Sequence, residues 1–134
     1  MIDIENQVFD RIKRSILARF PKTYVTGDYV KIPPLFPCVA IVQEDNTTYA
    51  ATQTSSESEN HAVIMHQVDV YSNRQANKKA ECKAIISEID KIMLNLGFTR
   101  TMLRPIPNGD DATIYRMTGR YVAIVGKDNT IYRQ

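Results

Sequence analysis

The alternation of side chains over residues 62–71 constrains the fold of this chain more than any other feature of its sequence. Apolar residues stand at even positions there, at Ala62, Ile64, Val68 and Val70, and mixed side chains fill the odd positions. A period of two residues is the spacing of one face of a β-strand, because successive side chains point to opposite faces. The middle of the chain is therefore predicted to be a long strand.

Two other segments have the longer repeat of an amphipathic helix, with apolar side chains three and four positions apart. These side chains are Ile4, Val8, Ile12 and Ile16 in the first segment and Cys82, Ile85, Ile86, Ile89, Ile92, Met93 and Leu96 in the second. Asp3 is the expected N-cap of the first helix, and Pro21 ends it. The second helix is expected to open at a capping box formed by Ser72 and Gln75, and to close at Gly97 in a Schellman turn.

Shorter segments supply the remaining strands. Apolar and β-branched residues between turn or proline positions predict strands at residues 24–30, 38–42, 99–106, 113–125 and 130–133. Gly119, inside the fourth of these, is a candidate bulge. The element order is then α-β-β-β-α-β-β-β. This order predicts an α+β fold, with a mainly antiparallel sheet and two helices packed on one face, in a single domain over residues 1–134.

Residues 44–60 form a long polar stretch with very little to bury. We expect a long mobile loop, with an extended hairpin as the alternative. Loops of this length are uncommon in compact domains and are often functional, so the stretch is a candidate contact surface as well as a candidate idle loop. The contact residues chosen from it are Asp45, Asn46, Thr54, Glu57 and Glu59.

The composition excludes several classes of protein. Seventeen basic and fifteen acidic residues give a net charge of +2, which is too little for the counterion release on which dedicated nucleic-acid proteins rely. We find no secretory signal, no transit peptide and no apolar run of the roughly 18 residues that a membrane span needs. Cys38 and Cys82 lie in apolar segments without metal-binding spacing, so we interpret them as free buried thiols.

Residue sets for catalysis or metal binding are not recognisable in this sequence. His61 and His66 are five positions apart on one predicted strand, so they should point to opposite faces. Neither a nucleophile elbow nor a glycine-rich phosphate loop occurs. Asp110 and Asp111 could form an acid–base pair or a cation site, but their place after Asn-Gly favours a hairpin turn. We therefore expect no enzymatic activity and no cofactor.

Arginine side chains recur on one face of the last predicted hairpin. Arg116 and Arg120 share that face, and Arg100 or Arg104 could join them from the partner strand. This basic stripe could meet DNA, an acidic neighbouring subunit or only water. Arg116 and Arg120 are candidate contacts on that basis, and Tyr132 and Arg133 are candidates on the short edge strand that follows.

Several stretches of the sequence are similar to one group of phage proteins. They are residues 2–6 (Ile-Asp-Ile-Glu-Asn), 58–62 (Ser-Glu-Asn-His-Ala), 70–73 (Val-Tyr-Ser-Asn), 78–81 (Lys-Lys-Ala-Glu), 96–100 (Leu-Gly-Phe-Thr-Arg) and 112–121 (Ala-Thr-Ile-Tyr-Arg-Met-Thr-Gly-Arg-Tyr). Together they resemble the small neck proteins of the tail terminator, or tail completion, type that phages and prophages of Gram-positive bacteria encode. Head–tail connector proteins are similar in size, and the stretches are not catalytic signatures.

The resemblance implies a structural virion protein without a cofactor. Such proteins form a ring, commonly of six copies, that caps the finished tail tube and joins it to the head connector or head completion protein. The ring would be assembled in the host cytoplasm without a membrane, and DNA would pass through it at most transiently. Residues 44–60 and 130–133 would then become ordered only in the assembled particle. The alternatives are another neck component or a small DNA-binding module that uses the basic stripe.

Overall fold

The computed structural model describes residues 1–49, 61–109 and 111–132. Its elements are α1 (Glu5–Arg19), β1 (Tyr24–Thr26), β2 (Cys38–Thr48), β3 (His61–Ser72), α2 (Lys78–Leu96), β4 (Thr99–Pro105), β5 (Tyr115–Gly126) and β6 (Ile131–Tyr132). This is the predicted order, α-β-β-β-α-β-β-β. The predicted α+β class is confirmed as well.

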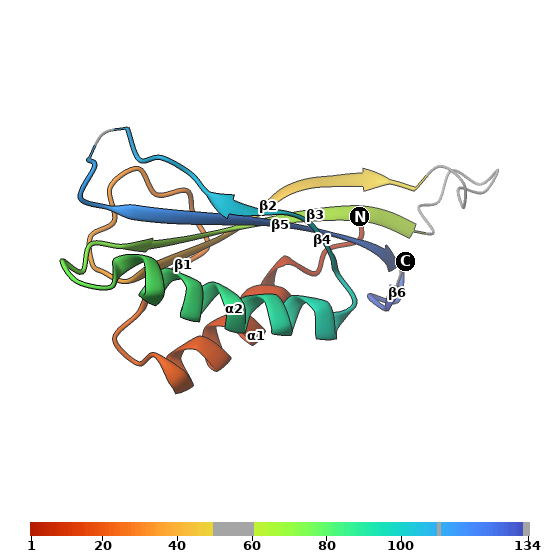
Figure 1. Ribbon diagram of the computed structural model, residues 1–134. Helices are drawn as coiled ribbons and strands as arrows, with labels where there is room; N and C mark the ends of the chain where they lie inside the picture. Colours follow the sequence, from red (N-terminus) through yellow and green to blue (C-terminus); the bar gives the residue numbers. More distant parts are fainter. Residues whose placement is uncertain (50–60, 110, 133–134) are drawn as a thin grey trace.

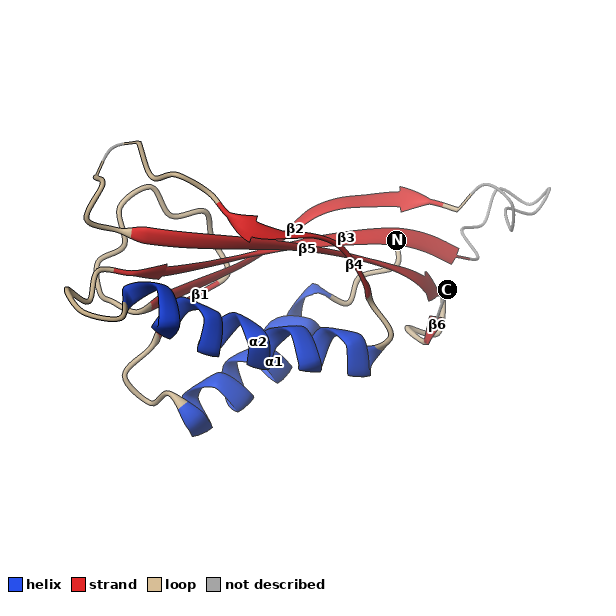
Figure 2. Ribbon diagram, viewed as in Figure 1, coloured by secondary structure: helices blue, strands red, loops and turns tan. Residues whose placement is uncertain are grey.

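The strands form one sheet in the order β1-β2-β3-β5-β4, and β6 pairs with β5 beside β4. Strand β1 runs parallel to β2, and every other pair is antiparallel. Both helices pack on the same face of the sheet, as predicted (Figures 1 and 2). We call this the helix-covered face and the opposite one the uncovered face.

The main core lies between the helices and the sheet. The even-numbered apolar residues of β3 point into it, from Ala62 to Val70, and each is fully buried. They meet the apolar stripes of α1 and α2, as the two periodicities predict. Tyr121 of β5 is also fully buried there, and its hydroxyl donates a 2.8 Å hydrogen bond to Asp90 of α2. Each large apolar side chain in this layer contributes about 1.5–3 kcal/mol.

The end of α2 is the predicted Schellman turn. Gly97 has a φ of 107°, in the region that favours glycine. Its backbone N–H donates to the carbonyl of Leu94 at 3.1 Å, and the N–H of Phe98 donates to that of Met93 at 3.0 Å. Phe98 is buried in the core below, so this turn joins α2 to β4 without exposing the aromatic ring.

The predicted helix starts are wrong in detail. Helix α1 begins at Glu5 with Ile4 at the N-cap position, although the Asp3 carboxylate does accept a 3.0 Å hydrogen bond from the Glu5 N–H. Ser72 is the last residue of β3, opposite Tyr115 of β5, because strand pairing continues through it. Its hydroxyl donates to Glu81 at 2.7 Å and caps no helix.

Helix α2 instead begins after Asn77, whose φ is 72°. Asn77 makes no side-chain capping bond. Left-handed backbone is more accessible to asparagine than to most residues. Asn77 can therefore adopt the turn conformation that precedes α2. The capping box at Ser72 and Gln75 is therefore not the start of the helix.

The polar stretch at residues 44–60 is not a loop from its beginning. Strand β2 continues to Thr48, opposite Ala62, with a bulge between Gln43 and Asp45. The N–H of Tyr49 also donates to the carbonyl of His61 at 2.8 Å. The predicted loop is therefore wrong for residues 44–49, where the structure has the alternative, an extended hairpin. Residues 50–60 lie outside the described part.

Two other strand predictions need correction. The first strand spans only Tyr24–Thr26, not residues 24–30. Gly119 lies in regular pairing opposite Leu103, and the irregularity falls in β4 between Arg100 and Met102. A Cβ at Gly119 would lie 3.0 Å from the ring of Tyr121. Glycine therefore permits the close approach of this ring and does not mark a bulge.

A second, smaller cluster lies on the uncovered face at one end of the sheet. The connections from β1 to β2 and from β4 to β5 gather at this end (Figure 1). They bring Ile114 against Cys38 and Tyr71, which are all buried. The Tyr71 hydroxyl donates a 3.3 Å hydrogen bond to the carbonyl of Val30.

Candidate assembly surface on the uncovered sheet face

A ladder of polar side chains crosses β3 and β5 on the uncovered face. Arg116 donates to Asp69 through Nε and approaches it through a second guanidinium nitrogen, both at 2.9 Å. Thr118 donates a short hydrogen bond to the same carboxylate oxygen. Gln67 donates to the other Asp69 oxygen at 3.0 Å and accepts from Arg120 at 2.9 Å. We call this set the Asp69 ladder.

The sheet register explains why these residues meet. Asp69 stands opposite Thr118 and Gln67 opposite Arg120, and residues opposite each other share a face. Asp69 is only 3% exposed, so its charge depends on these partners. The guanidinium group of Arg116 also lies 5.5 Å from the ring centre of Tyr71. Burial, and then the negative charge of Asp69, raise the pKa of Tyr71 to about 12, so its hydroxyl stays protonated.

Apolar side chains follow the ladder along the same face. Val63 stands opposite Ile124, and Met65 stands opposite Val122. All four are half-buried, with no helix above them. We call these four residues the apolar patch. Adjoining apolar side chains on an outward face are typical of contact surfaces between proteins.

Tyr132 of β6 borders the apolar patch. Its strand position is opposite Ile124, and its ring meets His61 edge-to-face at 5.2 Å. The side chain remains 44% exposed. A Cβ on Gly126 would lie 2.9 Å from this ring, so glycine lets it lie across β5. The structure thus brings one predicted contact residue to the edge of the patch.

The other predicted contacts are scattered. Asp45 and Asn46 are both in β2, but on opposite faces, because successive strand residues alternate. Asp45 is exposed on the uncovered face. The Asn46 side chain instead donates to the carbonyl of Ile2 at 2.7 Å, within the chain. Four further predicted contacts lie outside the described residues: Thr54, Glu57, Glu59 and Arg133.

The predicted basic stripe is only partly present. Arg104 stands opposite Thr118 and shares the uncovered face with Arg116 and Arg120. Arg100 lies on the other face, where it forms a 3.1 Å ion pair with Asp90 of α2. Of the two predicted alternatives, Arg104 is therefore confirmed and Arg100 is not, because the bulge in β4 changes the phase of that strand.

Sequence reasoning missed the acceptors of the ladder and the apolar patch. Asp69 and Gln67 are among the mixed side chains at odd positions of the predicted strand, and the sequence predicts no role for them. Their pairing with Arg116 and Arg120 depends on which strands are neighbours, and sequence alone does not supply that. A signal for the patch was available, since Val63 and Met65 are apolar residues at outward positions of an alternating strand.

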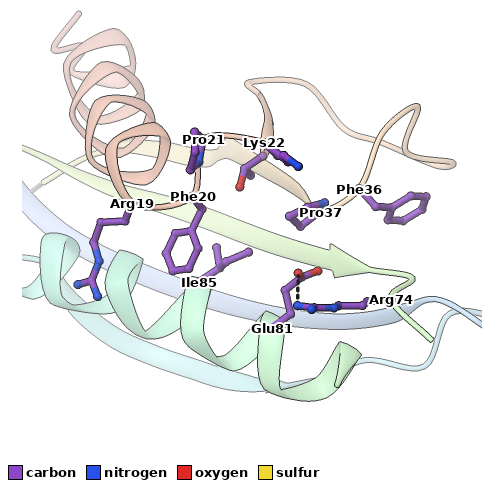
Figure 3. Close-up of a pocket in the computed structure, with 10 residues that line it drawn as sticks. Arg19, Phe20, Pro21, Lys22, Phe36, Pro37, Arg74, Glu81 and Ile85 are labelled. Carbon is purple, nitrogen blue, oxygen red and sulfur yellow. Dashed lines mark ion pairs between the residues drawn. The ribbon is translucent and has the colours of Figure 1, made fainter. Parts of the chain in front are cut away.

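A groove of about 500 Å³ lies elsewhere, between the end of α1 and the start of α2 (Figure 3). Phe20 and Ile85 form part of its apolar lining. Arg74 lines it as well and pairs with Glu81 at 3.7 Å. The hydroxyl of Thr23 is buried there with no hydrogen-bond partner among the described residues. These groups could hold an apolar or anionic segment, but they include no pair of an activated nucleophile and a base.

The titratable side chains of the core are held in unreactive states. Cys38 and Cys82 are free and buried, as predicted. Burial raises the pKa of Cys38 to about 11 and that of Cys82 to about 12, so both thiols stay protonated near neutral pH.

The exposed Asp111 has the predicted turn role. It accepts hydrogen bonds from the Thr113 N–H and hydroxyl at 2.9 and 2.6 Å. Its neighbour Asp110 lies outside the described residues.

The two histidines lie on opposite faces of β3, as predicted. His66 is fully buried against Phe98. Neither of its ring nitrogens has a hydrogen-bond partner among the described residues. Burial lowers the pKa of His66 to about 4, with a smaller opposing effect from Asp3. Within the described ranges, no group of three or more His, Cys, Asp or Glu side chains could hold a metal ion.

The Asp69 ladder yields a stability prediction. Replacing Asp69 with alanine removes the carboxylate that Arg116, Thr118 and Gln67 share, and leaves a partly buried guanidinium without its partner. We expect the free energy of unfolding to fall by about 2–4 kcal/mol in chemical denaturation. The control is Arg19→Ala, which breaks an ion pair whose arginine is 61% exposed, and it should cost at most about 1 kcal/mol. Equal small losses in both variants would contradict the structural role of Asp69.

The buried histidine yields a pH dependence. The folded state keeps His66 neutral to about pH 4, whereas the unfolded chain takes up a proton near pH 6.5. The unfolded state therefore binds more protons between these values, and stability falls as the pH falls. We expect a loss of about 2–3 kcal/mol between pH 7 and pH 4.5. His66→Leu should remove this slope, while His61→Leu, which removes the other histidine, should retain it. A slope unchanged in His66→Leu would contradict the assignment.

No helix in the described part of the chain is long and apolar enough to cross a membrane. No protein-family model and no curated protein matches the sequence.

Proposed function

We propose that this protein is a structural component of a phage neck: a tail terminator that forms a ring, caps the tail tube and joins it to the head connector. The ring is homo-oligomeric, and six is the common number of copies in the tail terminator proteins that the sequence resembles. Its partners are other copies of the chain, the tail tube protein and the head completion protein. The protein acts in the virion neck after assembly in the host cytoplasm.

The observation that carries this proposal is the one-sided covering of the sheet. The helices bury one face, while the apolar patch lies on the other without a helix above it. A protein that acts alone gains nothing from such a patch, because exposed apolar surface favours association. The patch and the open sheet edges beside it suit a chain that is completed by neighbouring proteins.

We further propose that the protein is not an enzyme and needs no cofactor. The thiols are buried and protonated, and His66 is enclosed in the core. The most polar cluster of the uncovered face, the Asp69 ladder, has its carboxylate bonded to three side chains. A carboxylate held in this way supports the sheet and is poorly placed to move a proton for a substrate.

The DNA-binding alternative has less support than the basic stripe suggested. Arg116 is paired with Asp69, and Arg120 donates its Nε hydrogen to Gln67. Part of the charge of the stripe is thus neutralised within the sheet, and Arg100 faces α2. A net charge of +2 adds little attraction for phosphates. Contact with DNA is therefore proposed only as its transient passage through the ring.

Deletion and complementation in the phage or prophage that carries the coding sequence test the proposal. Without the protein, electron microscopy of lysates should show tails of uncontrolled length and heads without tails. The unchanged chain should restore normal particles. The variant Val122→Lys places a charge in the apolar patch and should reduce infectious particles at least about tenfold, since a buried unpaired charge costs several kcal/mol.

The matched control is Leu94→Lys, the same kind of change at an apolar residue of α2 that is 43% exposed. It should complement fully. Tails of normal length that merely lack heads would indicate a head completion protein and contradict the terminator role. Full complementation by Val122→Lys would show that the apolar patch contacts nothing in the particle.

A further inference from the structure

We propose that the ring closes by strand pairing between copies: the outer edge of β4 in one copy pairs with the outer edge of β2, at residues 42–47, in the next. The inference rests on the proposed function and deepens it, because it names the surfaces that join the copies. It makes the sheet continuous around the ring. Each contact is head-to-tail, so both edges of every copy are used.

Most of both edges is open in the structure. On β2, the Asn46 N–H already donates to the Asp45 carboxylate at 2.9 Å. On β4, Pro105 has no N–H to donate. Strand β1 pairs with β2 only as far as Thr26, opposite Ala40. The chain still passes Ile41, since a Cβ on Gly27 would lie 3.8 Å from the Ile41 carbonyl oxygen. Beyond that point, no strand in the described part of the chain pairs with this side of β2. Strand β4 is the last strand on the other side, and among residues 1–49, 61–109 and 111–132 it pairs only with β5.

The two edges match in direction and length. From β2 to β4 the neighbours are antiparallel at each step, so β2 and β4 run in opposite directions. If the same sheet is continued from one copy into the next, β4 and β2 meet as antiparallel neighbours. The open part of β2 spans residues 42–47, and β4 has seven residues. Open backbone N–H and C=O groups on such edges are templates for pairing with another chain.

The two edges also match in charge. Strand β2 carries exposed Glu44 and Asp45, and the hollow beside it is lined by Glu5 and Asp28 among others. The edge of β4 is basic instead. It carries exposed Arg100 and Arg104, and the groove between β4 and α2 is lined by Lys83, with Asp90 as its acidic group.

Three pairings between copies are possible: β2 with β2, β4 with β4, and β4 with β2. The opposite charges of the two edges favour the last of these. Two β2 edges would bring acidic side chains together, and two β4 edges would bring arginines together, so pairing of like edges is disfavoured. Pairing of β4 with β2 places Arg104 and Asp45 on the same, uncovered face of a continuous sheet. Such a heterologous contact repeats from copy to copy and closes when the rotation permits.

Charged residues and bulges can also protect an edge from pairing. Both edges have a bulge, between Gln43 and Asp45 in β2 and between Arg100 and Met102 in β4. Protection alone predicts that neither edge contacts another copy. The experiment below separates the two roles, because protected edges would give no specific cross-link.

The test is oxidative cross-linking of the full-length double variant Asp45→Cys with Arg104→Cys. Cys38 and Cys82 are 0% exposed and can remain in place. On a non-reducing gel, β4–β2 pairing should give a ladder of covalent dimers, trimers and higher species that ends at the ring. The two single variants are the controls, and each should give at least about tenfold less cross-linked product, because like edges do not meet. Circular dichroism checks that all three variants are folded.

A charge exchange supplies an independent measurement. Asp45→Arg alone should weaken assembly at low salt, and Asp45→Arg combined with Arg104→Asp should restore it.

Two results of the cross-linking experiment would overturn the head-to-tail pairing. One is a single cysteine variant that gives as much cross-linked dimer as the double variant, and the other is the absence of a series of cross-linked species. Electron microscopy of the unchanged protein then separates the two claims. Rings that give no series of cross-linked species leave the proposed function intact and contradict only the β4–β2 pairing. If the protein forms no rings, either by itself or with tail tubes added, both the pairing and the proposed function are contradicted.

Discussion

The pairing of β3 with β5 is the constraint on which the rest of this structure depends. It runs over twelve residues of each strand without a register shift. Because side chains alternate, this one register sends Ala62 and Ile64 toward the helices and aligns Asp69 with Thr118 on the other face. A slip of one residue would exchange the two faces. The core, the Asp69 ladder and the apolar patch are thus three consequences of the same pairing.

Covering a sheet on one face only leaves the chain with two kinds of unfinished surface. One is the apolar patch, and the other is the backbone along the outer edges of β2 and β4. The Asp69 ladder and the cluster around Tyr71 and Ile114 stabilise the uncovered face without closing it. In the proposed ring, neighbouring copies and the tail tube would complete these surfaces.

Much of this fold could be predicted from the sequence, because the two periodicities report burial directly. The alternation over residues 62–71 and the stripes of α1 and α2 identified the core. The extent of β2 was missed, because residues 44–48 are polar and pair through their backbone, which the hydrophobic pattern does not report. The Asp69 ladder was missed for another reason. It joins residues 47 positions apart, and only the order of the strands in the sheet brings them together.

Backbone hydrogen exchange in the dispersed and the assembled protein tests most directly whether copies join through the sheet. If they do, assembly should protect amides on the outer edges of β2 and β4 and should leave α1 and the outward face of α2 unchanged. Protection confined to the helices, with β2 and β4 exchanging as fast in the assembly as in the dispersed chain, would contradict the account.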